Sequence, residues 1–135
     1  GFELKGDVVL ATSELRFVLD GYELNQLSPD LAHRQEINTW LRRIPWGKVV
    51  RVYIEGHTCD VGTPAINKTA SDERIRKVRE ILGNRIPDEK IMPLPHASTN
   101  PVESVERLPT EEMREKARRR NRRVVVRVSV AETNR

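Results

Sequence analysis

The fold is decided by residues 48–83, which read KVVRVYIEGHTCDVGTPAINKTASDERIRKVREILG. Apolar and polar residues alternate from Lys48 to Glu55, with Val50, Val52 and Ile54 on one face. A period of two is typical of a strand with one buried and one wetter face. We therefore predict a strand near the centre of a sheet.

A helix should follow this strand after a loop at residues 56–68, which contains two glycines and one proline. Thr69 can cap the first free amides of the helix, and Gly83 can end it. Its inward positions recur at the helical period, at Ile75, Val78, Ile81 and Leu82. The stretch is thus a strand, a loop and a helix.

On the N-terminal side we expect short strands at residues 8–11 and 15–19, because apolar residues alternate in the second. A helix should begin at residues 28–30, with Ser28 as its cap and Pro29 at its first position. Its apolar stripe consists of Ile37, Trp40, Leu41 and Ile44. Residues 45–47, a Pro-Trp-Gly segment, should end it.

On the C-terminal side, residues 91–94 suggest a short edge strand, because Pro93 and Pro95 lack the amide hydrogens of a regular ladder. Thr110 should start a helix that runs to Arg120, and residues 124–130 a closing strand rich in valine. The resulting order is β-α-β-α-β-α-β. It predicts an α/β (α+β) sandwich, in which helices pack on one face of a mixed sheet.

The composition indicates a globular module. The chain has 135 residues, of which 37% are hydrophobic, 33% charged and 4% aromatic, and its apolar runs are much shorter than the 18 residues of a membrane span. A chain of this length is expected to form one domain, at residues 1–135. The first residues lack the features of a signal peptide, and the initial Gly1 suggests a piece excised from a larger protein.

The positive charge is concentrated in residues 114–127. This segment holds seven arginines and one lysine against a single acid, Glu115, and so carries +7, whereas the net charge of the chain is +4. The rest of the chain is therefore mildly acidic. Such a segment is consistent with a nucleic-acid patch, a site for an anionic polymer, or a solvated helix that leads into a strand.

Cys59 is the one cysteine, which excludes an intramolecular disulfide and a multi-cysteine zinc site. His57 lies two residues away, but a Cys–His nucleophile needs an orienting group and an oxyanion hole, and a metal ion needs three or four ligands. His33 and His96 lie in other segments. We therefore expect no catalytic residue, no metal site and no cofactor.

Three short motifs stand out. They are Gly56-His57-Thr58-Cys59-Asp60-Val61-Gly62 with Asn67, Ser71-Asp72-Glu73-Arg74, and Asn121-Arg122-Arg123-Val124. In this order they resemble the OmpA-like C-terminal domain of outer-membrane proteins, peptidoglycan-associated lipoproteins and MotB-type flagellar stators, whose pattern is G-H-T-D-x-x-G-x-x-x-x-N-x-x-L-S-x-x-R-A. Residues 86–91 and 100–102 match its I-P-x-x-K-I and N-P-V segments, so the resemblance covers about residues 15–130.

The resemblance implies a mixed sheet with helices on one face and noncovalent binding of the peptidoglycan stem peptide. The bound group is the diamino acid, typically meso-diaminopimelate. It lies in a cleft beside the loop from Gly56 to Gly62, which we call the glycine loop. Arg74 falls on the family's binding arginine, and a guanidinium suits the carboxylate of such a zwitterion. We expect Arg74 to be partly exposed at the mouth of the cleft. The other residues expected there are Thr58, Cys59, Asp60, Asn67 and Arg122.

Cys59 stands where the family has its ligand-binding aspartate. A thiol with an ordinary pKa of about 8.5 is mostly neutral at pH 7 and does not replace a carboxylate opposite an ammonium group. Asp60 follows it and is the candidate replacement. Further departures from the family pattern are Ala70, Ile75, Pro95 and Ala97.

These observations predict a cell-wall anchoring module of the periplasm, associated with the outer membrane through parts of the protein outside this chain, with other envelope proteins as further partners. One alternative is a scaffold that has lost or changed the ligand and serves protein–protein contacts. A second is a basic nucleic-acid-binding module. The arginine-rich run from Arg118 to Arg123 lacks interleaved aromatic residues and any recognisable nucleic-acid-binding motif, so we expect no specific nucleic-acid partner.

Overall fold

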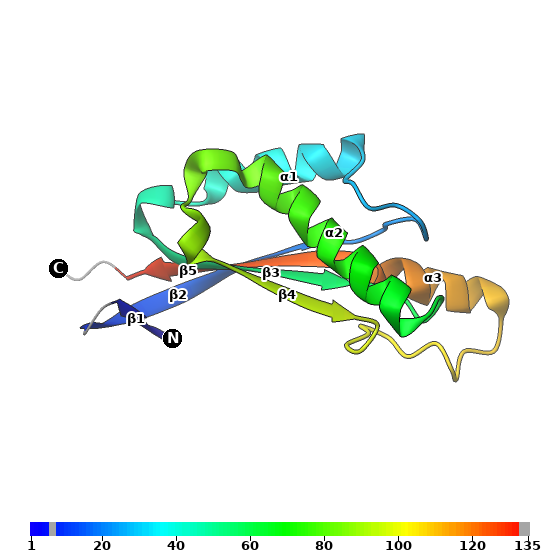
Figure 1. Cartoon of the computed structure of the whole chain (residues 1–135). Coiled ribbons are helices and arrows are strands. Elements are labelled where there is room, and N and C mark those ends of the chain that lie inside the picture. The colour runs from blue at the N-terminus through cyan, green and yellow to red at the C-terminus, as the bar shows by residue number, and fades with distance from the viewer. Residues whose placement is uncertain (6–7, 133–135) are drawn as a thin grey trace.

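The computed structural model describes residues 1–5 and 8–132, which form one mixed sheet and three α-helices (Figure 1). The strands are β1 (Phe2–Lys5), β2 (Val8–Leu19), β3 (Val49–His57), β4 (Ile91–Ala97) and β5 (Arg123–Ala131). The helices are α1 (Leu31–Arg43), α2 (Pro64–Leu82) and α3 (Glu111–Asn121). The predicted α+β architecture is confirmed, with β1 as an additional strand.

The strands lie in the order β1-β2-β5-β3-β4. β5 is antiparallel to both of its neighbours, whereas β4 is parallel to β3. The last strand in the sequence is therefore the middle strand of the sheet, and β3 lies beside it. β4 is an edge strand, as its prolines predict.

β2 is one strand where the sequence suggests two. Its central residues Thr12, Ser13 and Glu14 stay in the ladder, opposite Ala131, Val130 and Ser129 of β5. In β3, the predicted alternation is wrong at one position. Val49 is buried and Val50 half-buried, because the register against β5 shifts between Val49 and Arg51.

The core lies between the sheet and the two helices α1 and α2, which cover one of its faces (Figure 1). Its fully buried members include Leu19, Ile37, Val52, Ile54, Val78 and Val128. We call the opposite side of the sheet the helix-free face. α3 lies beyond the end of the sheet where β3 finishes (Figure 1). Among the described residues no helix is long and apolar enough to cross a lipid bilayer.

The start of α1 differs from the sequence-based expectation. Its cap is Asp30, not Ser28, and the helix begins at Leu31. The carboxylate of Asp30 accepts a hydrogen bond from the His33 amide at 2.8 Å, and the His33 ring accepts one from the Asp30 amide at 3.3 Å. These two reciprocal hydrogen bonds satisfy the backbone amides of Asp30 and His33, so the helix begins after Asp30 and Ser28 and Pro29 stay outside it.

The start of α2 also differs from the sequence-based expectation, and it affects the residues of the candidate site. The cap is Thr63, six positions before the predicted cap Thr69, and Pro64 is the first helical residue. The Thr63 hydroxyl accepts from the Ile66 amide at 3.2 Å, and a proline at this position loses no helical hydrogen bond. The loop after β3 is therefore short, and Asn67 is helical. Gly83 ends the helix with φ +60°, as predicted.

α2 lies directly on β3 because residue 56 has no side chain. A Cβ atom at Gly56 would come within 2.4 Å of the Ser71 carbonyl oxygen. The Ser71 hydroxyl instead donates to the Gly56 carbonyl at 2.7 Å. This contact fixes the first half of α2 over the end of β3, where the glycine loop begins.

Candidate functional site

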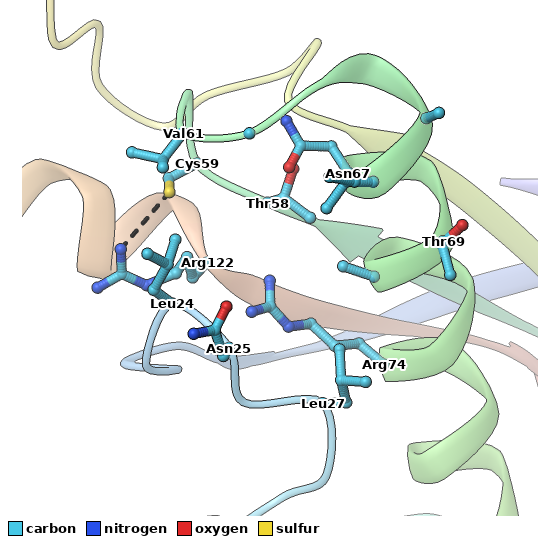
Figure 2. A pocket seen from close by; sticks show the side chains of 14 residues that line it. Leu24, Asn25, Leu27, Thr58, Cys59, Val61, Asn67, Thr69, Arg74 and Arg122 are labelled. Atoms are coloured by element: carbon cyan, nitrogen blue, oxygen red, sulfur yellow. Dashed lines mark hydrogen bonds between the residues drawn. The ribbon is translucent and has the colours of Figure 1, made fainter.

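A cavity of about 580 Å³ lies between the loop after β3, the first half of α2 and residues 20–30, which join β2 to α1 (Figure 2). Five of the six predicted ligand-binding residues line it, namely Thr58, Cys59, Asn67, Arg74 and Arg122. Its walls are largely apolar and are formed by Leu24, Leu27, Val61, Ala65, Ile66 and Ala70.

Arg74 is buried, which contradicts the expectation of a partly exposed side chain. Its exposed fraction is 1%. The guanidinium donates to three backbone carbonyls, those of Gln26 at 2.9 Å, His57 at 3.0 Å and Glu23 at 3.3 Å. It also lies over the Tyr22 ring, 4.9 Å from the centroid. These contacts replace water and tie residues 20–30 to β3 and α2.

The buried guanidinium of Arg74 keeps hydrogen-bonding capacity toward the cavity. Burial lowers the pKa of Arg74 to about 10, an effect to which the charge of Arg122 adds, so the group stays charged at neutral pH. A guanidinium has five N–H groups, and the bonds to described residues use one on each nitrogen. One N–H on each terminal nitrogen is left for a ligand.

Thr58 supplies a second polar group at the same place. Its side chain is 4% exposed, and its Oγ1 has no hydrogen-bond partner among residues 1–5 and 8–132. The Thr58 amide donates to the Ala97 carbonyl at 2.8 Å, which holds the residue at the end of β3. A buried hydroxyl without a partner is costly in a folded protein, so Thr58 can offer a hydrogen bond to a ligand at this wall of the cavity.

Cys59 faces Arg122 on the far side of the cavity (Figure 2). Its thiol is 2% exposed and lies 3.5 Å from Nη1 of Arg122. Arg122 also donates to the Tyr22 carbonyl at 2.5 Å and to Glu115 at 2.7 Å. Burial opposes the charge of Arg122, but the hydrogen bonds that its guanidinium donates to Glu115 and Cys59 outweigh this effect and raise the pKa of Arg122 above its ordinary value.

Asp60 does not lie with the other predicted residues. Its side chain is exposed and accepts a hydrogen bond at 3.0 Å from Arg118 of α3, and it is absent from the cavity lining. Within the described part of the chain, no carboxylate lines the cavity. The carboxylate of Asp60 therefore points away from the cavity and toward α3, as the alternation of side chains along an extended loop would suggest.

Asn67 supports the glycine loop from below. Gly62 has φ +101°, and a Cβ atom there would come within 3.1 Å of the Asn67 Oδ1. Asn67 is 6% exposed in the first half of α2. Only glycine fits this backbone conformation at such close contact, so Gly62 and Asn67 together set the position of the loop over the cavity.

The sequence did not reveal one wall of the cavity. Leu24, Asn25 and Leu27 line it from residues 20–30, and Arg74 reaches that segment across 48 positions of sequence. The available signal was Arg74 itself, as a motif residue expected at the cleft. Tyr22 stacks on His33 at a centroid distance of 4.6 Å, which anchors this wall to α1.

His57 and Cys59 do not form a dyad. The Cys59 thiol contacts Arg122, whereas the His57 ring lies 3.3 Å from a carboxylate oxygen of Glu55 and stacks on His96 at 4.9 Å. The expectation that His96 lies apart from His57 is therefore wrong. Burial, with the charge of Arg123, lowers the pKa of His57 to about 4, so its ring is neutral at neutral pH.

The basic segment is neutralised by acids from the whole chain. Seven of its eight cations have a carboxylate partner, in the pairs Arg114–Glu111, Lys116–Glu112, Arg118–Asp60, Arg119–Glu23, Arg120–Glu103, Arg122–Glu115 and Arg127–Glu55. Arg123 donates instead to the carbonyls of Asn121 and Asn100. Of the three interpretations of this segment, a helix that leads into a strand fits best.

Solved structures similar to this one have the same architecture. The peptidoglycan-associated lipoprotein from Burkholderia pseudomallei is 18% identical with a TM-score of 0.61, covering 85% of this chain and 89% of its own. The cell wall anchor of the T6SS from Pseudomonas aeruginosa is 20% identical with a TM-score of 0.62, covering 91% and 88%.

The OmpA-like domain of FopA1 from Francisella tularensis is 18% identical with a TM-score of 0.60, covering 98% of this chain and 82% of its own. No protein-family model matches the sequence, and no curated protein matches it significantly. The likeness to these proteins thus lies in the structure. The chain has the fold of the OmpA-like C-terminal domain.

Proposed function

We propose that this chain is a noncatalytic, cell-wall-binding domain that holds the diamino acid end of a peptidoglycan stem peptide in the cavity beside the glycine loop. Two similar structures support the proposal, because one is a peptidoglycan-associated lipoprotein and the other is a cell wall anchor. Because peptidoglycan lies in the periplasm, that compartment is part of the proposal. Outer-membrane association and contacts with other envelope proteins stay predictions.

The observation that carries the proposal is the polar floor of the cavity. Arg74 lines a space with apolar walls and has a positive charge and two N–H groups beyond those bonded to the three carbonyls, and Thr58 brings a buried hydroxyl without a partner among the described residues. A ligand carboxylate satisfies both groups, since a guanidinium binds a carboxylate through two parallel hydrogen bonds. The apolar walls suit the methylene chain of a diamino acid.

The ammonium end of the ligand has no carboxylate partner among the described residues that line the cavity. Cys59 replaces the family's aspartate, and Asp60 is paired with Arg118 outside the cavity. The loss of one charge-assisted hydrogen bond costs about 1.5–3 kcal/mol, or roughly 10- to 150-fold in affinity. We therefore propose that the chain binds peptidoglycan more weakly than a domain that keeps the aspartate.

The test is to fill the cavity without altering Arg74. Ala70 lines it and is half-buried, so Ala70→Trp places an indole inside. Lys68→Trp puts the same side chain on the same helix, at a residue that does not line the cavity and is 67% exposed. Co-sedimentation with purified peptidoglycan, and NMR titration with a stem tripeptide containing diaminopimelate, should show binding lost in Ala70→Trp and kept in Lys68→Trp.

Two outcomes would contradict the proposal. Undiminished binding by Ala70→Trp, with a native circular dichroism spectrum, would mean that the cavity is not the site. A wild-type chain that binds neither peptidoglycan nor the tripeptide would favour the alternative of a scaffold that keeps the fold for protein–protein contacts. The apolar walls and the missing carboxylate are the observations that favour that alternative.

A further inference from the structure

A second cluster of side chains lies on the helix-free face, at the adjacent ends of β3 and β4. Gly56 faces Ser71 of α2, so its neighbours Glu55 and His57 point to the opposite side of the sheet. The two side chains meet there, with the His57 Nε2 at 3.3 Å from the Glu55 Oε1. Neither group lines the cavity described above.

A β-bulge brings His96 to the same place. Gly56 is opposite Pro95 of β4 and His57 is opposite Ala97, so His96 is an extra residue in the ladder. Bulges re-aim a side chain in this way, often next to functional sites. The His96 Nε2 lies 3.5 Å from the same Glu55 Oε1 that His57 contacts, and Ala97 has a left-handed backbone with φ +53°.

The spacing of these groups matches that of metal ligands. Zinc is bound by histidine nitrogens and carboxylate oxygens at about 2.0–2.2 Å in a tetrahedron, which places two ligand atoms about 3.3–3.5 Å apart. In this chain the distances from Glu55 Oε1 to the Nε2 atoms of His57 and His96, 3.3 and 3.5 Å, already have that length. All three candidate ligand atoms lie within 4.8 Å of one another, and His96 is 29% exposed and can turn to close the third edge.

We propose that Glu55, His57 and His96 bind a divalent transition-metal ion of the zinc type. Two imidazoles and one carboxylate form a set that zinc sites use, with a fourth position open to water or another ligand. The proposal does not depend on peptidoglycan binding, because no residue of the cluster lines the cavity.

The burial of His57 and the unused capacity of its ring favour this site. The residue is 2% exposed, and its Nδ1 has no hydrogen-bond partner within the described residues. Its Nε2 lies 3.3 Å from Glu55 Oε1, which is long for a hydrogen bond, so this nitrogen is available to a metal ion.

Positive groups near the cluster set the strength of binding. Arg127 donates to the second oxygen of Glu55 at 2.5 Å, and Arg123 lies close enough to oppose a positive charge on His57. Arg127 fixes the orientation of the carboxylate and leaves Oε1 for the metal. Both arginines repel a cation, so we expect a single site of moderate affinity.

The test titrates the metal-free domain with zinc chloride by calorimetry and with cobalt chloride by absorption spectroscopy. Cys59→Ser is the background, because it removes the only thiol in the chain. One ion per chain, with the visible bands of tetrahedral cobalt, is the expected result. His96→Ala should weaken zinc binding at least about tenfold, as loss of metal-site partners does.

A matched pair of carboxylates tests the third ligand. Arg127 pairs with Glu55 and, at 3.6 Å, with Glu14, but only Glu55 belongs to the cluster. Glu55→Gln should weaken zinc binding about tenfold or more, whereas Glu14→Gln should leave it within about twofold. Zinc affinity that His96→Ala or Glu55→Gln leaves unchanged would overturn the proposal, as would the absence of stoichiometric binding in the folded Cys59→Ser chain.

Discussion

At the scale of single residues, Arg74 combines a structural and a binding role. Its guanidinium holds three backbone carbonyls of two separate segments and also lines the cavity. A charge alone does not achieve this, because the three bonds leave from three nitrogens of one planar group. The position therefore requires arginine for folding even where the ligand is weak.

Arg74→Lys should destabilise the domain although it keeps the charge. A lysine ammonium reaches fewer of the three carbonyls and leaves the others buried without a donor, which costs about 2–4 kcal/mol in free energy of unfolding. Arg76→Lys is the control, since Arg76 is exposed on the same helix and pairs with Glu73 and Glu80 at the surface. It should cost less than about 1 kcal/mol. Equal urea midpoints for the two variants would contradict the structural role.

Cys59→Asp should strengthen binding to the stem tripeptide without unfolding the chain. Cys59 is buried, so a carboxylate there needs a partner, and Arg122 is already 3.5 Å from the thiol. The new charge would then face the ligand ammonium across the cavity from Arg74. We expect a gain of about tenfold or more in affinity by NMR titration. Cys59→Asn has the same shape without the charge, and an equal gain there would rule out the charge as the cause.

At the scale of the elements, the position of α2 depends on one glycine in β3. Gly56→Ala would push a Cβ atom to 2.4 Å from the Ser71 carbonyl and force the helix away from the strand. We expect a loss of about 2–4 kcal/mol in free energy of unfolding. At Gly47 a Cβ atom meets nothing within 4 Å, so Gly47→Ala should change it by less than about 0.5 kcal/mol. Similar urea midpoints for both variants would contradict this account of the packing.

The elements show what local patterns can predict. The strand β3, the end of α2 and the helix α3 follow from period and caps, whereas the cavity residues from Thr58 to Arg74 were expected from the resemblance to the OmpA-like domain. The starts of α1 and α2 were harder to predict, because two candidate caps compete at each. Ser28 competes with Asp30 in α1, and Thr63 competes with Thr69 in α2. Pro64 was the available signal for the second. Contacts between distant segments, such as Arg74 with Gln26 or His57 with His96, have no local pattern at all.

At the scale of the whole molecule, the basic segment is part of a network that joins α3 to acids elsewhere in the chain. Arg118, Arg119 and Arg120 pair with Asp60, Glu23 and Glu103 from three different segments. Binding to phosphates would have to break these pairs. We therefore expect only weak, sequence-independent affinity for DNA or RNA in fluorescence anisotropy, lost at physiological salt. A specific complex that persists at that salt would contradict this conclusion.

The place of β5 in the sheet has a consequence for how the chain is made. β5 is the last strand in the sequence, yet β2 and β3 both pair with it, and Leu19 meets Val124 across more than a hundred residues. Until residues 123–131 leave the ribosome, two long strands expose unpaired edges. The sheet therefore cannot close before residues 123–131 are available. Until then its two partner strands need protection from aggregation.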